Sequence, residues 1–204
     1  WETNTAKKDT RMKAKQEVRK EILSYRNQMT HDEVMDRSRQ IIQRVLKTPE
    51  YEEADNVLLY ADYCHEVMTR ELFEDAILRK KRVYFPKSYG EDCHMEFYQV
   101  ISVKQLEAGY KGIREPAADE SLRYRFRTQE DTLMILPGVA FGTDGYRIGY
   151  GKGFYDRYLQ DKAQITRMGL AFSNQITEPF IHEEHDRKMD KIVTEEIIYS
   201  FLRI

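Results

Sequence analysis

One run of sequence, residues 132–159, joins a strand pattern, a glycine-rich turn and a helix pattern. It reads "TLMILPGVAFGTDGYRIGYGKGFYDRYL" and holds six of the ten glycines of the chain, all between Gly138 and Gly153. A short, continuous apolar segment such as "TLMIL" is typical of a strand covered on both faces, as central strands of parallel sheets are. The glycine-rich segment then leaves the carboxyl end of that strand, where open α/β sheets bind ligands.

The segments around this run predict further strands and helices of an α/β protein. "NVLLYA" (56–61), "TRELFEDAILRKK" (69–81) and "RVYFP" (82–86) have the strand, helix, strand order of a parallel unit. "HMEFYQV" and "TRMGLAF" predict two more strands. We therefore predict a Rossmann-like, three-layer α/β fold, with a mainly parallel central sheet and helices on both faces. Residues 1–204 are expected to form a single domain.

The N-terminal part of the chain predicts two helices. Residues 7–29 lack glycine and proline and place Val18, Ile22 and Tyr25 at helical spacing. "THDE" then has the pattern of a capping box, in which Glu33 reaches back to the amide of Thr30. The polar segment 109–130 predicts no regular element, and its length and polarity suggest a lid over a ligand.

Composition limits the classes of function. Lysine and arginine total 33 against 35 acidic residues, so the net charge of −2 gives no general attraction to nucleic acid or to an anionic membrane. No apolar run approaches the about 20 residues of a membrane helix. Cys64 and Cys93 have neither metal-site nor disulfide spacing. We expect a soluble cytoplasmic protein, and any anion-binding chemistry must be local.

The glycine-rich stretch is a candidate anion site. Backbone amides freed by such a loop, together with a helix N-terminus, favour negative charge, and Arg147 and Lys152 add two cations. A Walker loop requires Ser or Thr after the lysine, whereas Gly153 follows Lys152. The dinucleotide fingerprint is also absent, because the glycines are spaced G-x-G-x-G. The stretch is therefore either a different phosphate loop or a turn that needs glycine only for tight backbone geometry.

The flanking residues resemble a known family. "PGVAFGTDGYRIGYGKGFYDRYL" is similar to the signature of the 5-formyltetrahydrofolate cyclo-ligases, also called methenyltetrahydrofolate synthetases. Their pattern runs roughly Pro-Gly-x-x-Phe-Asp-x-x-Gly-x-Arg-Leu-Gly-x-Gly-x-Gly-x-Tyr-Asp. It is matched without a gap by the order Gly145, Arg147, Gly149, Gly151, Gly153, Tyr155 and Asp156. One position departs, because Gly142 stands where the family usually has Asp. Whether Asp144 substitutes for that acid stays open.

The resemblance extends over most of the chain. "KQEVR" supplies a lysine and an arginine, Lys15 and Arg19, one helical turn apart on the first helix, as the family does. Glu66 falls where the family places a substrate-contacting glutamate. "EHDRKMD" resembles a C-terminal motif whose first acid, here Asp186, helps to hold magnesium. "YFPK", residues 84–87, also recurs in similar form.

The resemblance implies an enzyme that converts 5-formyltetrahydrofolate, with or without a polyglutamate tail, to 5,10-methenyltetrahydrofolate. ATP and Mg²⁺ are the implied cofactors, ADP and phosphate the other products, and a phosphorylated formyl group the intermediate. The implied catalytic residues are Arg147, Lys152 and Tyr155. The implied nucleotide-binding residues are Lys15, Arg19, Arg147, Gly149, Gly151, Lys152, Gly153 and Phe154. The implied folate-binding residues are Ala61, Glu66, Tyr150, Gly151, Lys152 and Phe154. The implied metal ligands are Asp156 and Asp186.

Other signals are weaker or leave alternatives open. "HEEHD" (182–186) lacks the spacing of the H-E-x-x-H zinc motif. "RYRFR" (123–127) could stack on single-stranded nucleic acid, but the same alternation in a strand puts charge on one face and aromatic rings on the other. We expect a monomer with a small-molecule substrate and with no nucleic-acid or membrane partner. The alternative functions are a sugar-phosphate isomerase on a similar frame and a nucleotide or folate binder without turnover.

Overall fold

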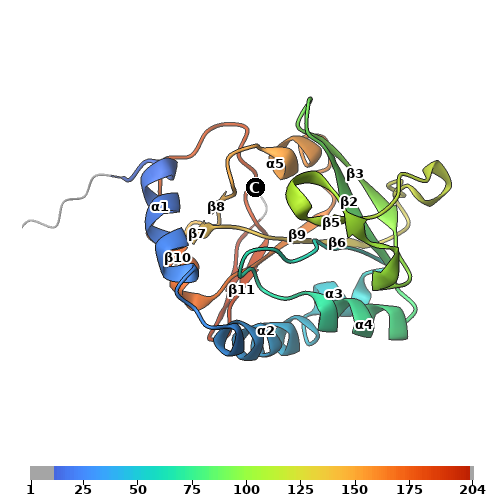
Figure 1. Cartoon of the computed structure of the whole chain (residues 1–204), viewed down its shortest axis with the longest axis horizontal. Coiled ribbons are helices and arrows are strands. Elements are labelled where there is room, and N and C mark those ends of the chain that lie inside the picture. Colours follow the sequence, from blue (N-terminus) through green and yellow to red (C-terminus); the bar gives the residue numbers. More distant parts are fainter. Residues whose placement is uncertain (1–11, 203–204) are drawn as a thin grey trace, which may run out of the picture.

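A seven-stranded sheet forms the centre of the computed structural model, which describes residues 12–202. Its order is β12-β11-β9-β6-β1-β2-β3 (Figure 1). The strands are β1 Asn56–Leu58, β2 Arg82–Tyr89, β3 His94–Gln99, β6 Thr132–Leu136, β9 Thr166–Leu170, β11 Lys191–Val193 and β12 Ile198–Ser200. Strands β11, β9, β6, β1 and β2 pair in parallel, whereas β3 and β12 pair antiparallel at the edges. The predicted mainly parallel sheet is confirmed, and its predicted central strand lies at the centre.

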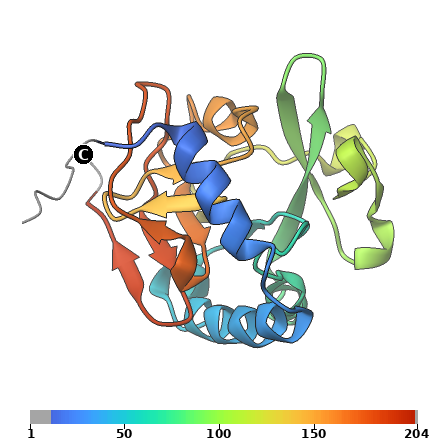
Figure 2. The same cartoon turned by 60° about the vertical axis from the view of Figure 1, so that its left-hand side comes forward.

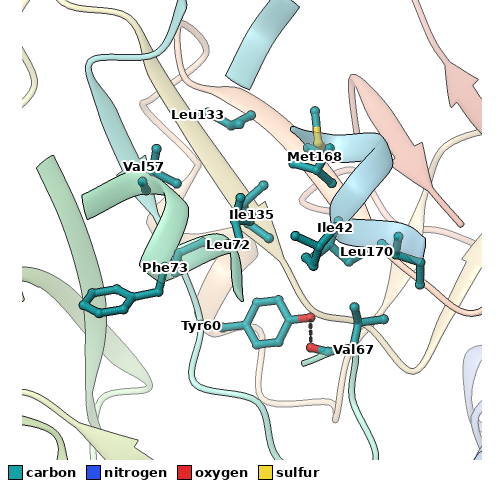
Figure 3. Close-up of a cluster of buried hydrophobic side chains, with 14 of the residues drawn as sticks. Ile42, Val57, Tyr60, Val67, Leu72, Phe73, Leu133, Ile135, Met168 and Leu170 are labelled. Atoms are coloured by element: carbon teal, nitrogen blue, oxygen red, sulfur yellow. Dashed lines mark hydrogen bonds between the residues drawn. The ribbon is translucent and has the colours of Figure 1, made fainter. Parts of the chain in front are cut away.

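Both faces of this sheet are covered. Along β6, Leu133 and Ile135 enter one hydrophobic cluster, and Met134 and Leu136 enter another. The first cluster lies under the helices α2 His31–Val45, α3 Pro49–Glu53 and α4 Arg70–Leu78, which follow one face in Figure 1. Figure 3 shows part of it, where Ile42 and Leu72 meet side chains of the sheet. The second cluster is covered by the short helix α5 Phe154–Tyr158 and by Phe141.

The first helix and a small second sheet form a third layer of contacts. α1 Lys15–Arg26 buries Val18 and Ile22 against Val139, Ala140 and Ile148. These belong to or adjoin the sheet β10-β7-β8, made of Ile176–Thr177, Ala140–Gly142 and Arg147–Ile148. Figure 2 shows α1 lying across this sheet. The glycine-rich stretch is therefore not one open turn, because part of it pairs as the antiparallel hairpin β7–β8.

The predicted start of the second helix is confirmed, whereas the first helix starts later than predicted, because residues 12–14 are not helical. The Thr30 and Glu33 capping box begins α2, with both of its hydrogen bonds present. The helix predicted for 7–29 is α1, which begins at Lys15, and residues 7–11 lie outside the described residues. None of the helices within 12–202 is both long and apolar enough to cross a membrane. The expectation of a single domain stays a prediction.

The polar segment 109–130, for which no element was predicted, contains only short ones. The strands β4 Glu107–Ala108 and β5 Arg114–Glu115 pair antiparallel around the 3₁₀ turn η2 Tyr110–Gly112. A further 3₁₀ turn of this segment is η3 Glu120–Leu122. The two other 3₁₀ turns, η1 Val103–Gln105 and η4 Ser173–Gln175, lie outside it. Elements of two or three residues are too short to show a hydrophobic period in the sequence.

The connections of the central sheet diverge between β1 and β6. The chain leaves β1, passes through α4 on one face and returns as β2 on one side. It leaves β6, passes through α5 on the opposite face and returns as β9 on the other side. Open α/β sheets form a crevice at the carboxyl ends of strands where the connections part in this way. The loops after β1 and β6 therefore border the expected ligand site.

Candidate functional site

A cavity of about 580 Å³ lies beyond the carboxyl ends of β1 and β6. Its volume is in the range of small-molecule sites. Its walls come from α1, the loop after β1, the glycine-rich loop, the 110–115 segment and residues 183–186. All residues that the sequence analysis placed in the site line this cavity, namely Lys15, Arg19, Ala61, Glu66, Arg147, Gly149, Tyr150, Gly151, Lys152, Gly153, Phe154, Tyr155, Asp156 and Asp186.

Two guanidinium groups, those of Arg19 and Arg147, lie against Gly149 and Gly151 of the glycine-rich loop. The Arg19 Nε donates to the Gly149 carbonyl over 2.9 Å. A Cβ at Gly151 would lie 3.5 Å from a guanidinium nitrogen of Arg19, and Gly151 has a φ of +95° that side chains rarely adopt. A Cβ at Gly149 would lie 3.1 Å from an Arg147 guanidinium nitrogen. The glycines therefore let cations lie against the backbone.

The same loop presents unpaired hydrogen-bond donors. The backbone N–H groups of residues 150–153 donate to no acceptor in the described part of the chain. Within residues 12–202 the Lys152 ammonium also has no ion-pair partner. Because α5 has only five residues, its dipole adds little to this positive field. Free amides and nearby cations together are the chemistry of an anion site.

A buried ion pair connects the loop to α5. An Arg147 guanidinium nitrogen donates to Asp156 Oδ2 over 3.1 Å, and both side chains are largely buried. The other Asp156 oxygen accepts from the Arg187 amide over 3.2 Å. The Arg147 guanidinium lies 5.2 Å from the centre of the Tyr155 ring, and its Nε is buried without a partner among the described residues. An unpaired buried donor is costly, so this nitrogen is suited to a ligand oxygen.

A second group of acids faces the start of α1. The Lys15 ammonium donates to Asp186 Oδ1 over 2.7 Å. Ligand atoms of Glu183, His185 and Asp186 lie within 4.8 Å of one another. Burial alone would raise the pKa of Asp186, but hydrogen bonds from Lys15 and the Glu183 amide give a net lowering. Asp156, the other predicted metal ligand, lines the cavity but does not belong to this group.

The loop after β1 presents Glu66 through a strained turn. Cys64 and His65 have φ values of 46° and 56°, and the Glu66 amide donates to the Tyr63 carbonyl over 3.1 Å. This is the geometry of a type I′ turn, which normally favours asparagine and glycine. The Tyr63 amide in turn donates to Glu66 Oε2 over 3.0 Å. Burial raises the pKa of Glu66 to about 7, against the opposing attraction of Arg26.

Several cavity residues carried no sequence signal. Tyr110 and Lys111 line it from the 109–130 segment, and the ring of Tyr110 contacts that of Phe154 with centroids 5.8 Å apart. The lid role of this segment stays a prediction. Glu183 and His185 come from the "HEEHD" segment, which was noticed only as a poor zinc motif. A side chain in an irregular segment has no period that could have marked it.

The "RYRFR" segment lies away from the cavity and does not form a strand. Its arginines pair with carboxylates rather than standing free. The pairs are Arg123 with Glu96 and Glu120, Arg125 with Glu120, and Arg127 with Glu130. The alternating pattern is thus explained neither by a strand nor by an unpaired basic surface.

The departure at Gly142 has a local explanation. A Cβ at this position would lie 2.3 Å from Asp144 Oδ1. The Asp144 carboxylate therefore occupies the space into which a side chain at 142 would extend, and it accepts weakly from the Tyr146 amide over 3.4 Å. The turn of the β7–β8 hairpin keeps an acid at this place, two residues later in the chain.

Comparisons with known proteins agree over nearly the whole chain. The model of the 5-formyltetrahydrofolate cyclo-ligase family matches residues 11–195. A Mus musculus protein named 5-formyltetrahydrofolate cyclo-ligase is 27% identical over 201 residues, which are 95% of each protein. The NMR structure of Aquifex aeolicus 5,10-methenyltetrahydrofolate synthetase superposes with a TM-score of 0.76 at 32% identity, covering 91% of this chain and 92% of that one.

A structure of a 5,10-methenyltetrahydrofolate synthetase from Mycoplasma pneumoniae has a TM-score of 0.67 at 26% identity and covers 89% of this chain and 98% of that one. The matches therefore include the sheet, both flanking layers and the glycine-rich loop, not the loop motif alone. Since the family model covers far more than half of the sequence, the chain belongs to the 5-formyltetrahydrofolate cyclo-ligase family.

Proposed function

We propose that this ligase converts 5-formyltetrahydrofolate to 5,10-methenyltetrahydrofolate in a reaction that consumes ATP and requires Mg²⁺. The observation that carries the proposal is the cavity wall at residues 147–153, which combines unpaired amides, Lys152 and an Arg147 whose buried Nε has no partner among the described residues. Such a wall suits a polyphosphate. The remaining wall, with Glu66, Tyr60 and Phe154, offers a buried carboxyl group between aromatic rings, which suits a flat ring system with polar edges.

The residues proposed for the nucleotide act by position and charge. ATP supplies a phosphoryl group that lets the formyl oxygen leave as phosphate when N10 of the folate closes the ring. Lys15, Arg19, Arg147 and Lys152 neutralise phosphate oxygens, and the amides of Gly149, Gly151 and Gly153 with Phe154 beside them hold the phosphate chain. Phosphoryl transfer depends on positioning and charge neutralisation more than on covalent chemistry by the protein.

For magnesium, the residues present fit a hard cation. Mg²⁺ prefers oxygen ligands, and Asp186 and Glu183 offer carboxylates in one group with His185. We propose Asp186 as the principal ligand and Asp156 as a second one. Both Asp156 oxygens already accept hydrogen bonds, one from Arg147 and one from the Arg187 amide. Asp156 can therefore bind the metal only if Arg147 turns from it toward phosphate. Lys15, now on Asp186, would likewise move to phosphate.

For the folate, we propose that the Glu66 carboxylate accepts hydrogen bonds from the polar ring edge. Ala61 leaves space beside it, and Tyr150 and Phe154 supply aromatic faces at the mouth. Tyr155 is placed to order the transferred group, because burial raises the pKa of its hydroxyl and keeps it a neutral donor. Cytoplasmic location, a monomeric state and the lack of nucleic-acid and membrane partners stay predictions.

The test is turnover with a strict nucleotide balance. Purified protein with 5-formyltetrahydrofolate and Mg-ATP should form methenyltetrahydrofolate, followed by its ultraviolet absorbance, with one ADP and one phosphate per product. Omitting ATP or adding a magnesium chelator should abolish product. Arg147→Ala should lower kcat/KM by at least 100-fold, since a charge-assisted contact at a reacting phosphate is lost. The exposed Arg125→Ala is the matched control and should retain full turnover.

Two other outcomes would point to the alternatives. Folate and nucleotide binding without product would favour a binding protein. Activity on a sugar phosphate without ATP would favour an isomerase. Either result would contradict the proposed reaction.

A further inference from the structure

A buried arginine outside the predicted site lies directly behind the cavity wall. Arg26, in the last turn of α1, is 0% exposed. One guanidinium nitrogen donates to the Gly138 carbonyl over 3.3 Å, and the other donates to the Tyr150 hydroxyl. The guanidinium also lies 5.6 Å from the centre of the Tyr150 ring. Arg26 therefore ties α1 to the start and to the middle of the segment that follows β6.

No carboxylate of the described residues forms an ion pair with Arg26. Its Nε is buried and has no hydrogen-bond partner in that part of the chain. A buried charge without a close counter-ion is expensive, so the nearest anion inside the protein gains importance. The charge of Glu66 raises the pKa of three tyrosine hydroxyls, those of Tyr60, Tyr150 and Tyr155. The charge of Arg26 lowers the pKa of two of them, Tyr60 and Tyr150.

Glu66 is a carboxylate on which the charge of Arg26 acts, because Arg26 lowers its pKa against the effect of burial. It is 7% exposed, lines the cavity, and has the Tyr63 amide as its one hydrogen-bond donor among the described residues. The nearby Asp62 is occupied differently, because it accepts from the Thr69 amide and hydroxyl. Two charged groups shift the pKa of Glu66, namely Arg26 from α1 and Asp62 from its own loop. Glu66 in turn raises the pKa of Tyr60 at the end of β1, Tyr150 in the glycine-rich loop and Tyr155 in α5.

We propose that Arg26 is a positioning residue for folate binding, which fixes Tyr150 at the cavity wall and supplies the positive charge opposite the Glu66 carboxylate. This inference rests on the proposed function. Arg26 touches neither the cavity nor a reacting atom; it acts through Glu66 and Tyr150. The burial of Glu66 works against its charged form, and Arg26 is the main attraction that works for it.

The test separates the charge of Arg26 from its shape. Arg26→Gln keeps a donor for the Gly138 carbonyl but lacks the charge, Arg26→Met keeps only the length, and Arg26→Lys keeps the charge. Binding of 5-formyltetrahydrofolate without ATP, by titration calorimetry, and kcat/KM with Mg-ATP are both measured from pH 5.5 to 9. In the wild type, affinity should rise through a midpoint near pH 7, where Glu66 ionises.

In the neutral variants Arg26→Gln and Arg26→Met, the midpoint should move to higher pH by about one unit. This is the smallest shift expected when an opposite charge beside a carboxyl group is removed. At pH 7 the KM for folate should rise severalfold while kcat stays close to wild type. Arg26→Lys should restore the midpoint. Glu66→Gln should remove the pH step, alone and together with Arg26→Gln. Arg44→Gln, an arginine on α2 that donates to a backbone carbonyl, is the matched control.

The proposal is overturned if either neutral variant folds, with an unchanged melting temperature, and keeps the wild-type midpoint. Failure of both neutral variants to fold while Arg26→Lys folds would also overturn it, because the charge would then serve the fold alone. A wild-type protein that turns over folate without these shifts leaves the reaction standing and removes only this inference. A wild type that neither binds nor converts folate removes the proposed function itself.

Discussion

At the scale of single residues, the candidate site combines buried charged side chains that have few hydrogen-bond partners with residues in left-handed backbone conformations. Arg147 is buried with an unpaired Nε, Glu66 is buried with one hydrogen-bond donor, and Cys64 and His65 adopt left-handed backbone. Each left-handed residue costs about 1–2 kcal/mol. Strain of this kind persists where the surrounding structure over-determines it, and it gathers at functional sites.

The burial of Glu66 predicts a conflict between stability and function. Its pKa is near 7 in the folded protein and 4.5 in the reference state, so the folded state holds this proton more tightly. Stability therefore falls as pH rises from about 4.5 to 7 and stays lower above it. Glu66→Gln, which never ionises, should stabilise the protein by roughly 1–3 kcal/mol at pH 8 and by almost nothing at pH 4.5.

Urea unfolding of wild type and Glu66→Gln at the two pH values measures this difference. The exposed Glu53→Gln is the control and should leave the stability unchanged at both. Folate binding by Glu66→Gln should be weaker in spite of its higher stability. Equal stability of the two proteins at pH 8 would mean that Glu66 is solvated in solution and would contradict its assigned burial.

The sequence predicted many residues that line the cavity, because their chemistry and spacing are fixed along the chain, and their roles stay predictions. The motif from Gly145 to Asp156 lies in one loop, so its spacing survives as sequence. Arg26 was missed for the opposite reason. Nothing in a linear pattern distinguishes a buried arginine from the basic residues that usually end a helix at the surface.

At the scale of elements, the ends of helices decide how side chains reach the site. α1 places Lys15 and Arg19 one turn apart, and both reach the cavity, as their spacing predicted. α4 was predicted for 69–81 and ends at Leu78. Its end is a Schellman motif, in which the Lys81 amide donates to the Ala76 carbonyl and the Lys80 amide to the Ile77 carbonyl, each over 2.9 Å.

This motif predicts a stabilising substitution far from the site. Lys80 occupies its left-handed position with a φ of 61°, and its side chain is exposed. Glycine adopts this conformation without steric cost. Lys80→Gly should raise the free energy of unfolding by about 0.5–1 kcal/mol, which for a chain of this size is about 1–4 °C in melting temperature.

Calorimetric melting of Lys80→Gly checks the sign, and Lys20→Gly is the matched control. Lys20 is exposed in the middle of α1, where glycine should cost about 1 kcal/mol. Opposite signs are expected for the two substitutions. A loss of stability at Lys80 would show that this helix end does not adopt the left-handed turn in solution.

The hairpin β7–β8 shows where element prediction from sequence ends. Its strands have three and two residues, and a two-residue strand has no alternation to detect. The pairing depends instead on contacts with α1 and β10, which are distant in the chain. Five strands of the central sheet, β1, β2, β3, β6 and β9, were predicted because each lies in a longer apolar run, whereas β11 and β12, of three residues each, were not predicted.

At the scale of the whole molecule, the function follows from where the connections of the sheet part. The loops after β1 and β6 leave on opposite sides, which opens the crevice between them. α1 lies across the small sheet (Figure 2) and contributes Lys15 and Arg19 to the cavity wall. Strand order was not predictable beyond the central place of 132–136, because apolar strands carry no label for their neighbours. The order of the elements sufficed for the fold class, since alternating strands and helices favour a parallel sheet.

The measurement that tests this account most directly is Mg-ATP binding by titration calorimetry to wild type, Lys152→Ala and Lys20→Ala. The side-chain ammonium groups of both lysines lack partners among the described residues, so neither substitution should disturb the fold, but only Lys152 lines the cavity. Loss of a charge-assisted contact costs about 1.5–3 kcal/mol. Lys152→Ala should bind Mg-ATP at least tenfold more weakly than the wild type, whereas Lys20→Ala should bind it with unchanged affinity. Equal affinity of all three proteins, or no binding by the wild type, would contradict the proposed nucleotide site.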